Sequence, residues 1–421
     1  MCRVSSLVLL LAVFAAQLTG GELLGSVMCG YQGWFRTPGD GTNTGWHHYF
    51  SGQGGKDFGP GACGIDVWPD VRELLMSDRF ATPFHFPDGS VAEVFSSVRP
   101  TTIDVHFRWM KEYGVDGVFL QRFAVTTRDS RFRAPLDTVL DACRTSAKAH
   151  GRSWALMYDM SGLKPGEMES VITDWRRLRT EQKFAESLKE PSYLRHRGKP
   201  LIALWGIGFN DRAPMLDEWR TLIAFFKDPA EGGCAVMLGA PAYWRTGNRD
   251  AIADPEVKEL LAQADVISPW NVGRYGTSQD VEGHVRNTLT GDLAWCQEKK
   301  VELLPVVFPG FSWHNLQAGR GQVAKVDAIA RRGGRFLWSQ CQRFHAAGAK
   351  MLYVAMFDEL DEGTAIFKVR QDPPVGASLF VSEPDVPGDR YLRLVGQATR
   401  LVRGEKVPEE DGLPTAVTAG K

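Results

Sequence analysis

Near its C-terminus this chain of 421 residues reads Met351-Leu352-Tyr353-Val354-Ala355-Met356-Phe357 and then Asp358-Glu359-Leu360-Asp361-Glu362-Gly363-Thr364. The first stretch is short, apolar and without alternation, which predicts a strand buried on both faces, as in parallel sheets. The four carboxylates that follow indicate that the strand ends at a polar site. Two of them, Glu359 and Glu362, stand three residues apart and suggest acid/base chemistry. Clustered acids also begin ordinary solvated loops, so the rest of the chain must separate the two interpretations.

Seven other apolar runs of similar length precede this one. They cover residues 27–31, 117–121, 154–158, 201–205, 235–238, 266–269 and 303–308. Between them apolar residues recur at helical spacing, as at Leu136, Val139, Leu140 and Cys143. Eight strand–helix units predict an α/β fold, a (β/α)8 (TIM) barrel. An open doubly wound sheet fits less well, because fewer units or a glycine-rich dinucleotide turn would be expected.

The longest segment between predicted strands, residues 36–100, follows the first strand. In a barrel this insertion lies at the end where such enzymes keep their active sites. Its Trp46, His47 and His48 are therefore candidate binding residues. The alternative is that the segment only covers the mouth of the barrel.

Composition excludes several classes of partner and cofactor. Lys and Arg (49) nearly balance Asp and Glu (50), so no nucleic-acid partner is predicted. No GxGxxG or P-loop motif is present, and the cysteines show no CxxC or CxxH spacing, so neither a nucleotide cofactor nor a metal is expected. The 13 Trp residues are compatible with stacking on sugar rings, although most tryptophans in proteins are core.

The N-terminus has the pattern of a cleaved secretory signal. Arg3 is followed by an apolar stretch over residues 8–16 and then by small residues, which predicts a signal peptide over residues 1–21. The protein is then secreted or periplasmic. No other apolar stretch is long enough for a membrane span. We expect a catalytic domain over residues 22–403, a disordered tail over 404–421, and mostly free, buried thiols.

The predicted strand ends carry polar or aromatic residues that a barrel would bring together. They are Tyr31, Gln121, Arg122, Asp159, Trp205, Trp270, Asn271, Trp313 and His314. Aromatic rings that converge with carboxylates predict a cleft for an oligosaccharide or polysaccharide. The histidines among the candidates could equally be structural, and Asp159 and Asp361 are second choices as acids.

Two motifs carry a resemblance to a known family. Phe357-Asp358-Glu359-Leu360-Asp361-Glu362-Gly363-Thr364-Ala365-Ile366 resembles the Phe-Asn-Glu-Trp-His-Glu-Gly-Thr-x-Ile signature of glycoside hydrolase family 99, the endo-α-mannosidases. The opening Gly30-Tyr31-Gln32-Gly33-Trp34-Phe35, with Asp40-Gly41 and Trp46-His47-His48 after it, is similar to that family's first-strand motif. Weaker likeness over residues 109–123 and 309–315 extends the resemblance over most of the chain. It suggests a branch similar to families 99 and 71, whose bacterial members are often labelled xylosidase or arabinosidase.

The resemblance implies roles for both glutamates and no cofactor. Glu359 matches the base that deprotonates the sugar 2-hydroxyl, and Glu362 matches the general acid/base. The 2-oxygen then attacks the anomeric carbon, and water opens the resulting 1,2-anhydro sugar with overall retention. The chain departs from the signature at Asp358, Leu360 and Asp361, where the family has Asn, Trp and His. Phe367 stands where the family often has Glu.

The chemistry of acetal cleavage is consistent with this pair. One carboxyl must be protonated and the other ionised near neutrality, and two close carboxyls separate their own proton affinities. The sequence therefore predicts a secreted retaining α-glycosidase acting on complex glycans. Two alternatives stay open: an inverting hydrolase similar to the family 71 α-glucanases, and a non-catalytic barrel in which Trp46, Trp270 and Trp313 hold glycan.

Overall fold

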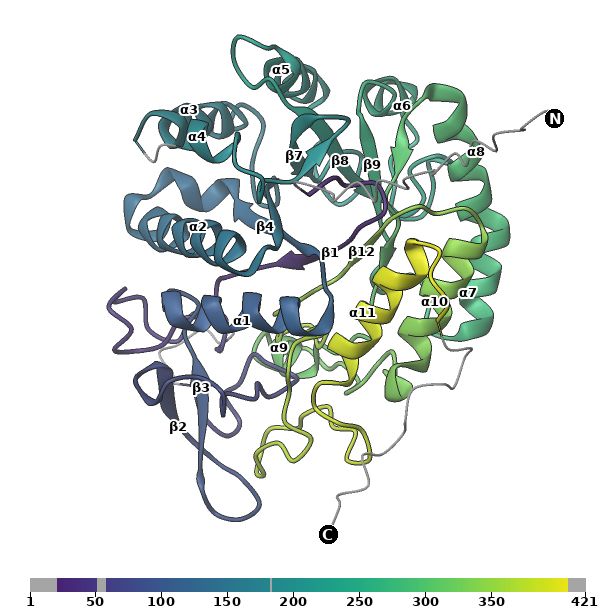
Figure 1. Ribbon diagram of the computed structural model, residues 1–421. Helices are drawn as coiled ribbons and strands as arrows, with labels where there is room; N and C mark the ends of the chain where they lie inside the picture. The colour runs from purple at the N-terminus through teal and green to yellow at the C-terminus, as the bar shows by residue number, and fades with distance from the viewer. Residues whose placement is uncertain (1–20, 51–57, 182–183, 408–421) are drawn as a thin grey trace, which may run out of the picture.

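The computed structural model describes residues 21–50, 58–181 and 184–407 (Figure 1). The predicted signal peptide, apart from Gly21, and residues 408–421 of the predicted tail lie outside the described residues. No helix in the described part of the chain has the length and apolar character needed to cross a membrane.

Parallel strands form the centre of the molecule. In chain order they are β1 (Val27–Tyr31), β4 (Gly117–Phe123), β5 (Ser153–Asp159), β7 (Lys199–Trp205), β8 (Ala235–Pro241), β9 (Val266–Trp270), β10 (Glu302–Leu303), β11 (Val306–Val307) and β12 (Leu352–Val354). Their order in the sheet is β10-β9-β8-β7-β5-β4-β1-β12-β11. A short β6 (Arg195–His196) pairs antiparallel with β7. The central strands are buried, as their unalternating apolar sequences predict.

The two ends of this strand order are joined by the chain itself. Only Leu304 and Pro305 separate β10 from β11. The Leu304 amide donates to Ile267 O (2.8 Å) of β9, and the Tyr353 amide of β12 donates to Pro305 O (3.1 Å). The segment over β10 and β11 thus occupies one strand position and closes the sheet. The predicted (β/α)8 barrel with a long insertion after its first strand is confirmed.

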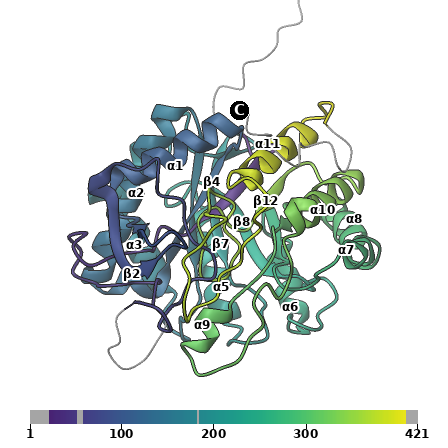
Figure 2. The ribbon, with the colours of Figure 1, turned by 90° about the horizontal axis from the view of Figure 1, so that it is seen from below.

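Helices surround the strands in chain order (Figures 1 and 2). They are α1 (Pro100–Tyr113), α2 (Ser130–His150), α3 (Glu169–Glu181), α4 (Phe184–Ser187), α5 (Leu216–Lys227), α6 (Pro255–Leu261), α7 (Ser278–His284), α8 (Thr290–Lys299), α9 (His314–Ala318), α10 (Arg335–Ala346) and α11 (Arg390–Val402). A π-helical turn, Val285–Leu289, links α7 to α8. In α2 the predicted apolar face of Leu136, Val139, Leu140 and Cys143 is buried toward the barrel.

The last predicted strand, residues 351–357, is shorter in the structure. Only Leu352–Val354 form β12. The chain nevertheless continues along the barrel wall, because the Ala355 amide donates to Val307 O (2.9 Å) and the Phe357 amide to Gly30 O (2.7 Å). The acidic segment that follows is therefore delivered directly beside the end of β1.

The insertion after β1 builds a small core of its own. It contains the antiparallel hairpin of β2 (Arg79–His85) and β3 (Val91–Phe95). Aromatic rings of Tyr49, Phe58 and Trp68 pack on one another and on this hairpin, and the Tyr49 hydroxyl donates to Phe95 O (2.7 Å). The hairpin lies below α1 in Figure 1. This packing gives the insertion a fixed position from which it can hold residues of the site.

Candidate active site

Asp358 connects the acidic segment to the turn that follows β1 through hydrogen bonds. Its fully buried carboxylate accepts hydrogen bonds from the backbone amides of Gln32 (2.7 Å) and Gly33 (2.9 Å). Gly33 has φ +61°, and a Cβ there would lie 2.7 Å from Val139 Cγ1, so only glycine fits this turn. Burial raises the pKa of Asp358 to about 7, although the two amides favour its ionised form.

Glu359 is fixed by hydrogen bonds at both carboxylate oxygens. Gln32 Nε2 donates to Oε1 (2.8 Å) and Thr364 Oγ1 donates to Oε2 (2.7 Å), and the side chain is 5% exposed. Burial raises the pKa of Glu359 well above its usual range, and the charges of Glu362 and Asp361 act in the same direction. The two donors oppose them by favouring the carboxylate. Glu359 is thus a rigidly oriented group with high proton affinity.

Glu362 is less constrained than Glu359. Its side chain is half-buried, and its carboxyl oxygens accept no hydrogen bond from any residue in the described ranges. The backbone is held instead, because the Ser312 amide donates to Glu362 O (2.9 Å). Burial and the neighbouring Asp361 raise the pKa of Glu362 to about 7, against the opposing charge of Arg320. The carboxyl is therefore accessible and titrates near neutrality.

Asp361 meets a neutral histidine from the insertion. His48 Nδ1 lies 3.0 Å from Asp361 Oδ2. Burial and the charge of Arg36 lower the pKa of His48 to about 3, while burial and Asp66 raise that of Asp361 to about 7. The imidazole stacks on Trp34, with ring centroids 3.7 Å apart at 7°. His48 and Trp34 therefore form a stacked pair of rings beside the acidic segment.

Asp66 connects the insertion to the loop after β11. Its fully buried carboxylate accepts hydrogen bonds from the Ser312 hydroxyl and from the amides of His314 (2.7 Å) and Asn315 (2.8 Å). Its own amide donates to Leu360 O (2.8 Å). One buried side chain thus positions the acidic segment and α9 together.

Asp159 and two tryptophans face the barrel interior near Glu359. Gln121 Nε2 donates to Asp159 Oδ2 (3.0 Å). Burial, followed by the charges of Glu359 and Asp159, raises the pKa of the Tyr353 phenol, so both carboxyls lie around this ring. The ring of Trp270 lies 6.2 Å from that of Tyr353 and 5.6 Å from that of Trp205. Glu359, Asp159 and the half-buried rings of Trp270 and Trp205 therefore lie on the same side of the barrel interior, and their binding roles stay a prediction.

Comparison with known proteins adds a likeness of fold. No protein-family model and no curated protein sequence matches this chain. Among solved structures it is similar to the family 99 endo-α-mannosidase from Bacteroides thetaiotaomicron, with a TM-score of 0.62 and 14% identity, over 91% of this chain and 98% of that chain. The same values hold for that enzyme in complex with bis-tris-propane. The chain has a glycoside hydrolase family 99-like fold. At 14% identity the likeness is one of fold alone.

Two predicted binding residues of this family 99-like barrel point away from its interior. The Tyr31 hydroxyl bonds to His106 Nδ1 of α1 (2.8 Å), and Arg122 pairs with Asp174 of α3 (2.6 Å) and Asp137 of α2 (2.8 Å). Successive side chains of a strand alternate between faces, so Gln121 faces inward and Arg122 outward. The prediction that Tyr31 and Arg122 bind substrate is therefore wrong, and both connect strands to outer helices.

Three further candidates have structural roles. Asn271 is fully buried and donates through Nδ2 to Val306 O (2.9 Å), which holds the end of β9 to β11. Trp46 packs on Phe58 in the core of the insertion, with centroids 5.1 Å apart. His47 Nδ1 contacts Trp34 O (3.1 Å). These three support the site from outside.

Trp313 and His314 lie on the loop after β11, next to the acidic segment. Trp313 is 37% exposed, and His314, the first residue of α9, contacts Ala324 O through Nδ1 (2.6 Å). The exposed indole remains a candidate surface for a sugar ring.

Sequence reasoning missed Gln32, Trp34 and Asp66 as site residues. Gln32 and Trp34 lie in the first-strand motif, and Gln32 is the first residue after β1. A polar amide side chain directly after a buried strand could have indicated Gln32 as a site residue. Asp66 offers no comparable signal, because its partners are 246 or more residues away along the chain.

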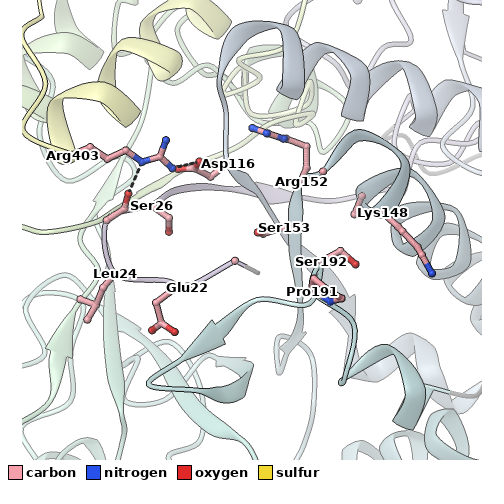
Figure 3. A pocket seen from close by; sticks show the side chains of 14 residues that line it. Glu22, Leu24, Ser26, Asp116, Lys148, Arg152, Ser153, Pro191, Ser192 and Arg403 are labelled. Carbon is pink, nitrogen blue, oxygen red and sulfur yellow. Dashed lines mark hydrogen bonds and ion pairs between the residues drawn. The ribbon is translucent and has the colours of Figure 1, made fainter. Parts of the chain in front are cut away.

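Within the described residues no group of three or more His, Cys, Asp or Glu is arranged to hold a metal ion. The six described cysteines are buried and free, as predicted. A cavity of about 510 Å³ lies at the opposite end of the barrel, where Ser26, Asp116 and Arg152 precede β1, β4 and β5 (Figure 3). None of the predicted site residues lines it.

Proposed function

We propose that this protein is a glycoside hydrolase that cleaves α-glycosidic bonds in complex glycans. The observation that carries the proposal is a pair of neighbouring glutamates with different surroundings. Glu359 is buried and hydrogen-bonded at both oxygens, whereas Glu362 is half-buried without such partners among the described residues and has a pKa of about 7. Both follow β12 at the end of the barrel where such folds carry active sites.

The hydrogen bonds of the two glutamates support different roles for them. The pKa values of both carboxyls are raised by burial and by neighbouring carboxylates, so the pair holds a proton near neutrality. Burial raises the pKa of Glu359 strongly, but Gln32 and Thr364 both donate to its carboxylate and favour the ionised form. Because Glu362 has no such donors among the described residues, we place the shared proton on Glu362. Glu362 then protonates the leaving oxygen as general acid, and Glu359 acts as base.

We propose that these two carboxyls act through the sugar's own 2-hydroxyl, with overall retention. Glu359 removes the proton of the 2-hydroxyl, and the freed oxygen attacks the anomeric carbon as Glu362 protonates the departing oxygen. A 1,2-anhydro sugar forms and the glycosidic bond breaks. Water, deprotonated by Glu362, then opens the anhydro ring, and Glu359 returns the proton to the 2-oxygen.

The neighbouring structures support this class of reaction without fixing the sugar. The solved structure with the family 99-like fold is an endo-α-mannosidase, and both motifs quoted from this chain resemble that family. Asp361 and its partner His48 line the site where the signature differs, so the sugar is not assigned to mannose. Attack by the 2-oxygen requires only that the 2-hydroxyl lie trans to the departing oxygen, as it does in α-mannosides and α-L-arabinosides. The N-terminal segment supports export of the protein, to the periplasm or outside the cell.

A hydrolysis screen tests the proposal. Wild type and Glu362→Gln are incubated with α-mannan, α-glucan, xylan and arabinan oligosaccharides, and products are read by mass spectrometry. Exposed Glu405, paired with Arg400 of the far helix α11, supplies the control variant Glu405→Gln. Cleavage by wild type and the control alone supports the proposal. Cleavage by none overturns it, and cleavage by all three would mean that Glu362 is not the acid.

An inverting mechanism is the second candidate, because Asp361 is a further buried carboxyl with a pKa of about 7 beside Glu362. It could activate water directly at the anomeric carbon. The anomer released first, read by proton NMR, separates the two: the α-anomer indicates retention and the β-anomer inversion for an α-linked substrate.

A further inference from the structure

A polar cleft opens on the same end of the barrel as the glutamates. It has a volume of about 520 Å³ and is lined by the loops that follow β7, β8 and β9, including Phe209, Tyr243, Arg249 and Arg274. Pockets of this size accommodate small ligands. The acidic segment follows β12 and lies across the barrel mouth from these three loops.

Aromatic rings connect this cleft to the glutamates. From Tyr353, beside Glu359, the contacts run to Trp270 (6.2 Å between centroids), then to Trp205 (5.6 Å) and to Phe209 of the cleft (4.7 Å). Trp205 and Trp270 are half-buried, and the Arg212 guanidinium lies over the Trp205 ring, 5.3 Å from its centroid. Sugar rings stack on such surfaces, so the exposed parts of Trp205 and Trp270 offer contacts to a glycan between the glutamates and the cleft, whereas Tyr353 and Phe209 are buried.

The charged side chains of the cleft differ in whether they have an oppositely charged partner. Asp250 accepts hydrogen bonds from Arg274 Nε (2.6 Å) and from the amides of Ala242 (3.1 Å) and Tyr243 (3.2 Å). Asp211 pairs with Arg212 (2.7 Å). Exposed Arg249 donates only to the Tyr243 hydroxyl (2.6 Å), and no carboxylate in the described part of the chain pairs with it.

The loop holds Arg249 in a constrained backbone conformation. Its φ is +53°, which side-chain-bearing residues rarely adopt, and the Asn210 side chain donates to Arg249 O. The guanidinium lies 4.5 Å from the centroid of the Tyr243 ring, which keeps it extended over that face. Arg249 lines the cleft, and its Nε and Nη2 make no hydrogen bond with a described residue, so they are available to a ligand.

We propose that this cleft is a subsite for an anionic substituent of the glycan, with Arg249 as its principal ligand. The guanidinium fork matches the two oxygens of a uronic-acid carboxylate or of a sulfate ester. The inference rests on the proposed function, since the substituent belongs to the same glycan that the glutamates cleave. The substrate class would then be acidic polysaccharides.

Equilibrium binding tests the subsite independently of turnover. Glu362→Gln protein is titrated calorimetrically with uronate-bearing, sulfated and neutral oligosaccharides that share the same α-mannan or xylan backbone. The expected result is that at least one anionic form binds about tenfold more tightly than its neutral counterpart, with a preference that weakens as salt rises. The uronate and sulfate arms identify which anion is preferred.

Substitutions in the same background locate the effect. Glu362→Gln/Arg249→Met should lose the preference and keep neutral affinity, and Arg249→Lys should keep part of it. Arg176→Met removes an exposed arginine on α3 that pairs with Glu231, and should change nothing. Equal affinity for anionic and neutral oligosaccharides, absence of binding by every anionic form, or a preference that survives Arg249→Met would overturn the subsite. If wild type still cleaves the neutral members, only the subsite fails, whereas loss of both cleavage and binding removes the proposed function as well.

Discussion

The two ends of the barrel treat carboxylates in opposite ways. Where strands begin, Asp116 accepts a hydrogen bond from the Val27 amide (2.9 Å) and forms an ion pair with Arg403 (2.5 Å; Figure 3). Asp265 likewise accepts a hydrogen bond from the Val236 amide (2.8 Å) and forms an ion pair with Lys227 (3.0 Å). Each ties neighbouring strands together next to a neutralising cation. Where strands end, the four carboxyls of residues 358–362 pair with no Lys or Arg of the described residues.

This difference separates stability from chemistry. A paired aspartate at the beginning of a strand is satisfied and unavailable to a substrate. Burial raises the pKa of Asp116 as well, but the charge of Arg403 opposes that shift. The carboxyls of residues 358–362 have raised pKa values without a paired Lys or Arg among the described residues and can exchange protons near neutrality, which costs stability and enables acid/base catalysis. The same side-chain chemistry is thus used for two purposes according to what surrounds it.

The substitution Glu362→Gln should have the largest effect on activity and tests this difference between the two ends of the barrel. Loss of a general acid should lower kcat by about 10²- to 10⁴-fold. The free energy of unfolding should not fall, because the Glu362 side chain makes no hydrogen bond within the described residues that the amide would lose. Steady-state kinetics and urea denaturation measure the two quantities. A drop in stability that accounts for the lost activity would contradict the assignment.

The pH dependence should follow the proton on Glu362. Its pKa is raised to about 7, so the acid is protonated below that pH and kcat/KM should fall about tenfold per pH unit above it. The folded state also binds this proton more tightly than the unfolded chain, so the stabilisation is complete below about pH 4.3 and is lost as pH rises through 7. Rate profiles and denaturation between about pH 5 and 8 check both trends. In Glu362→Gln the alkaline limb should disappear.

Gln32→Met removes one of the two hydrogen bonds that orient Glu359. Loss of a hydrogen bond to a charged group costs about 1.5–3 kcal/mol, so kcat/KM should fall about tenfold to a hundredfold. Gln263→Met, just beyond the end of α6, is the matched control and should leave kcat/KM unchanged. Equal activity of the two variants would show that Glu359 does not depend on Gln32.

At the opposite end, Asp116→Ala should give the reverse pattern. It leaves the buried Val27 amide and Arg403 without their partner and should lower the free energy of unfolding by about 1–3 kcal/mol, with kcat unchanged. Asp217→Ala, whose side chain is almost fully exposed, should lie within about 0.5 kcal/mol of wild type. Urea denaturation and steady-state kinetics of both variants make the comparison. A loss of kcat in Asp116→Ala would mean that the two ends are coupled.

The sequence predicts the barrel and the location of the acidic segment because both depend on local patterns. Short buried strands, amphipathic helices and a run of acids at a strand end can all be read along the chain. The side of the sheet to which each side chain points is harder to predict. In a strand buried on both faces, the sequence does not tell whether Gln121 or Arg122 points into the barrel. Arg122 is explained only by Asp137 and Asp174 on two different helices.

Partners distant in sequence account for the remaining misses. Gln32 meets Glu359 across 327 residues, and Asp66 meets Ser312 across 246. No pattern within a window of the sequence links such pairs. Signatures of a known family supply part of this information, which is why Glu359 and Glu362 could be proposed from the sequence while Asp66 could not.

The most direct test of the central claim compares leaving groups. kcat/KM is measured for wild type and Glu362→Gln on α-glycosides of the sugar that the screen identifies, one with an alkyl and one with a nitrophenyl leaving group. If Glu362 is the general acid, the deficit of the variant is about 10²- to 10⁴-fold for the alkyl glycoside and becomes small for nitrophenyl, which needs little protonation. An equal deficit for both leaving groups would contradict the account.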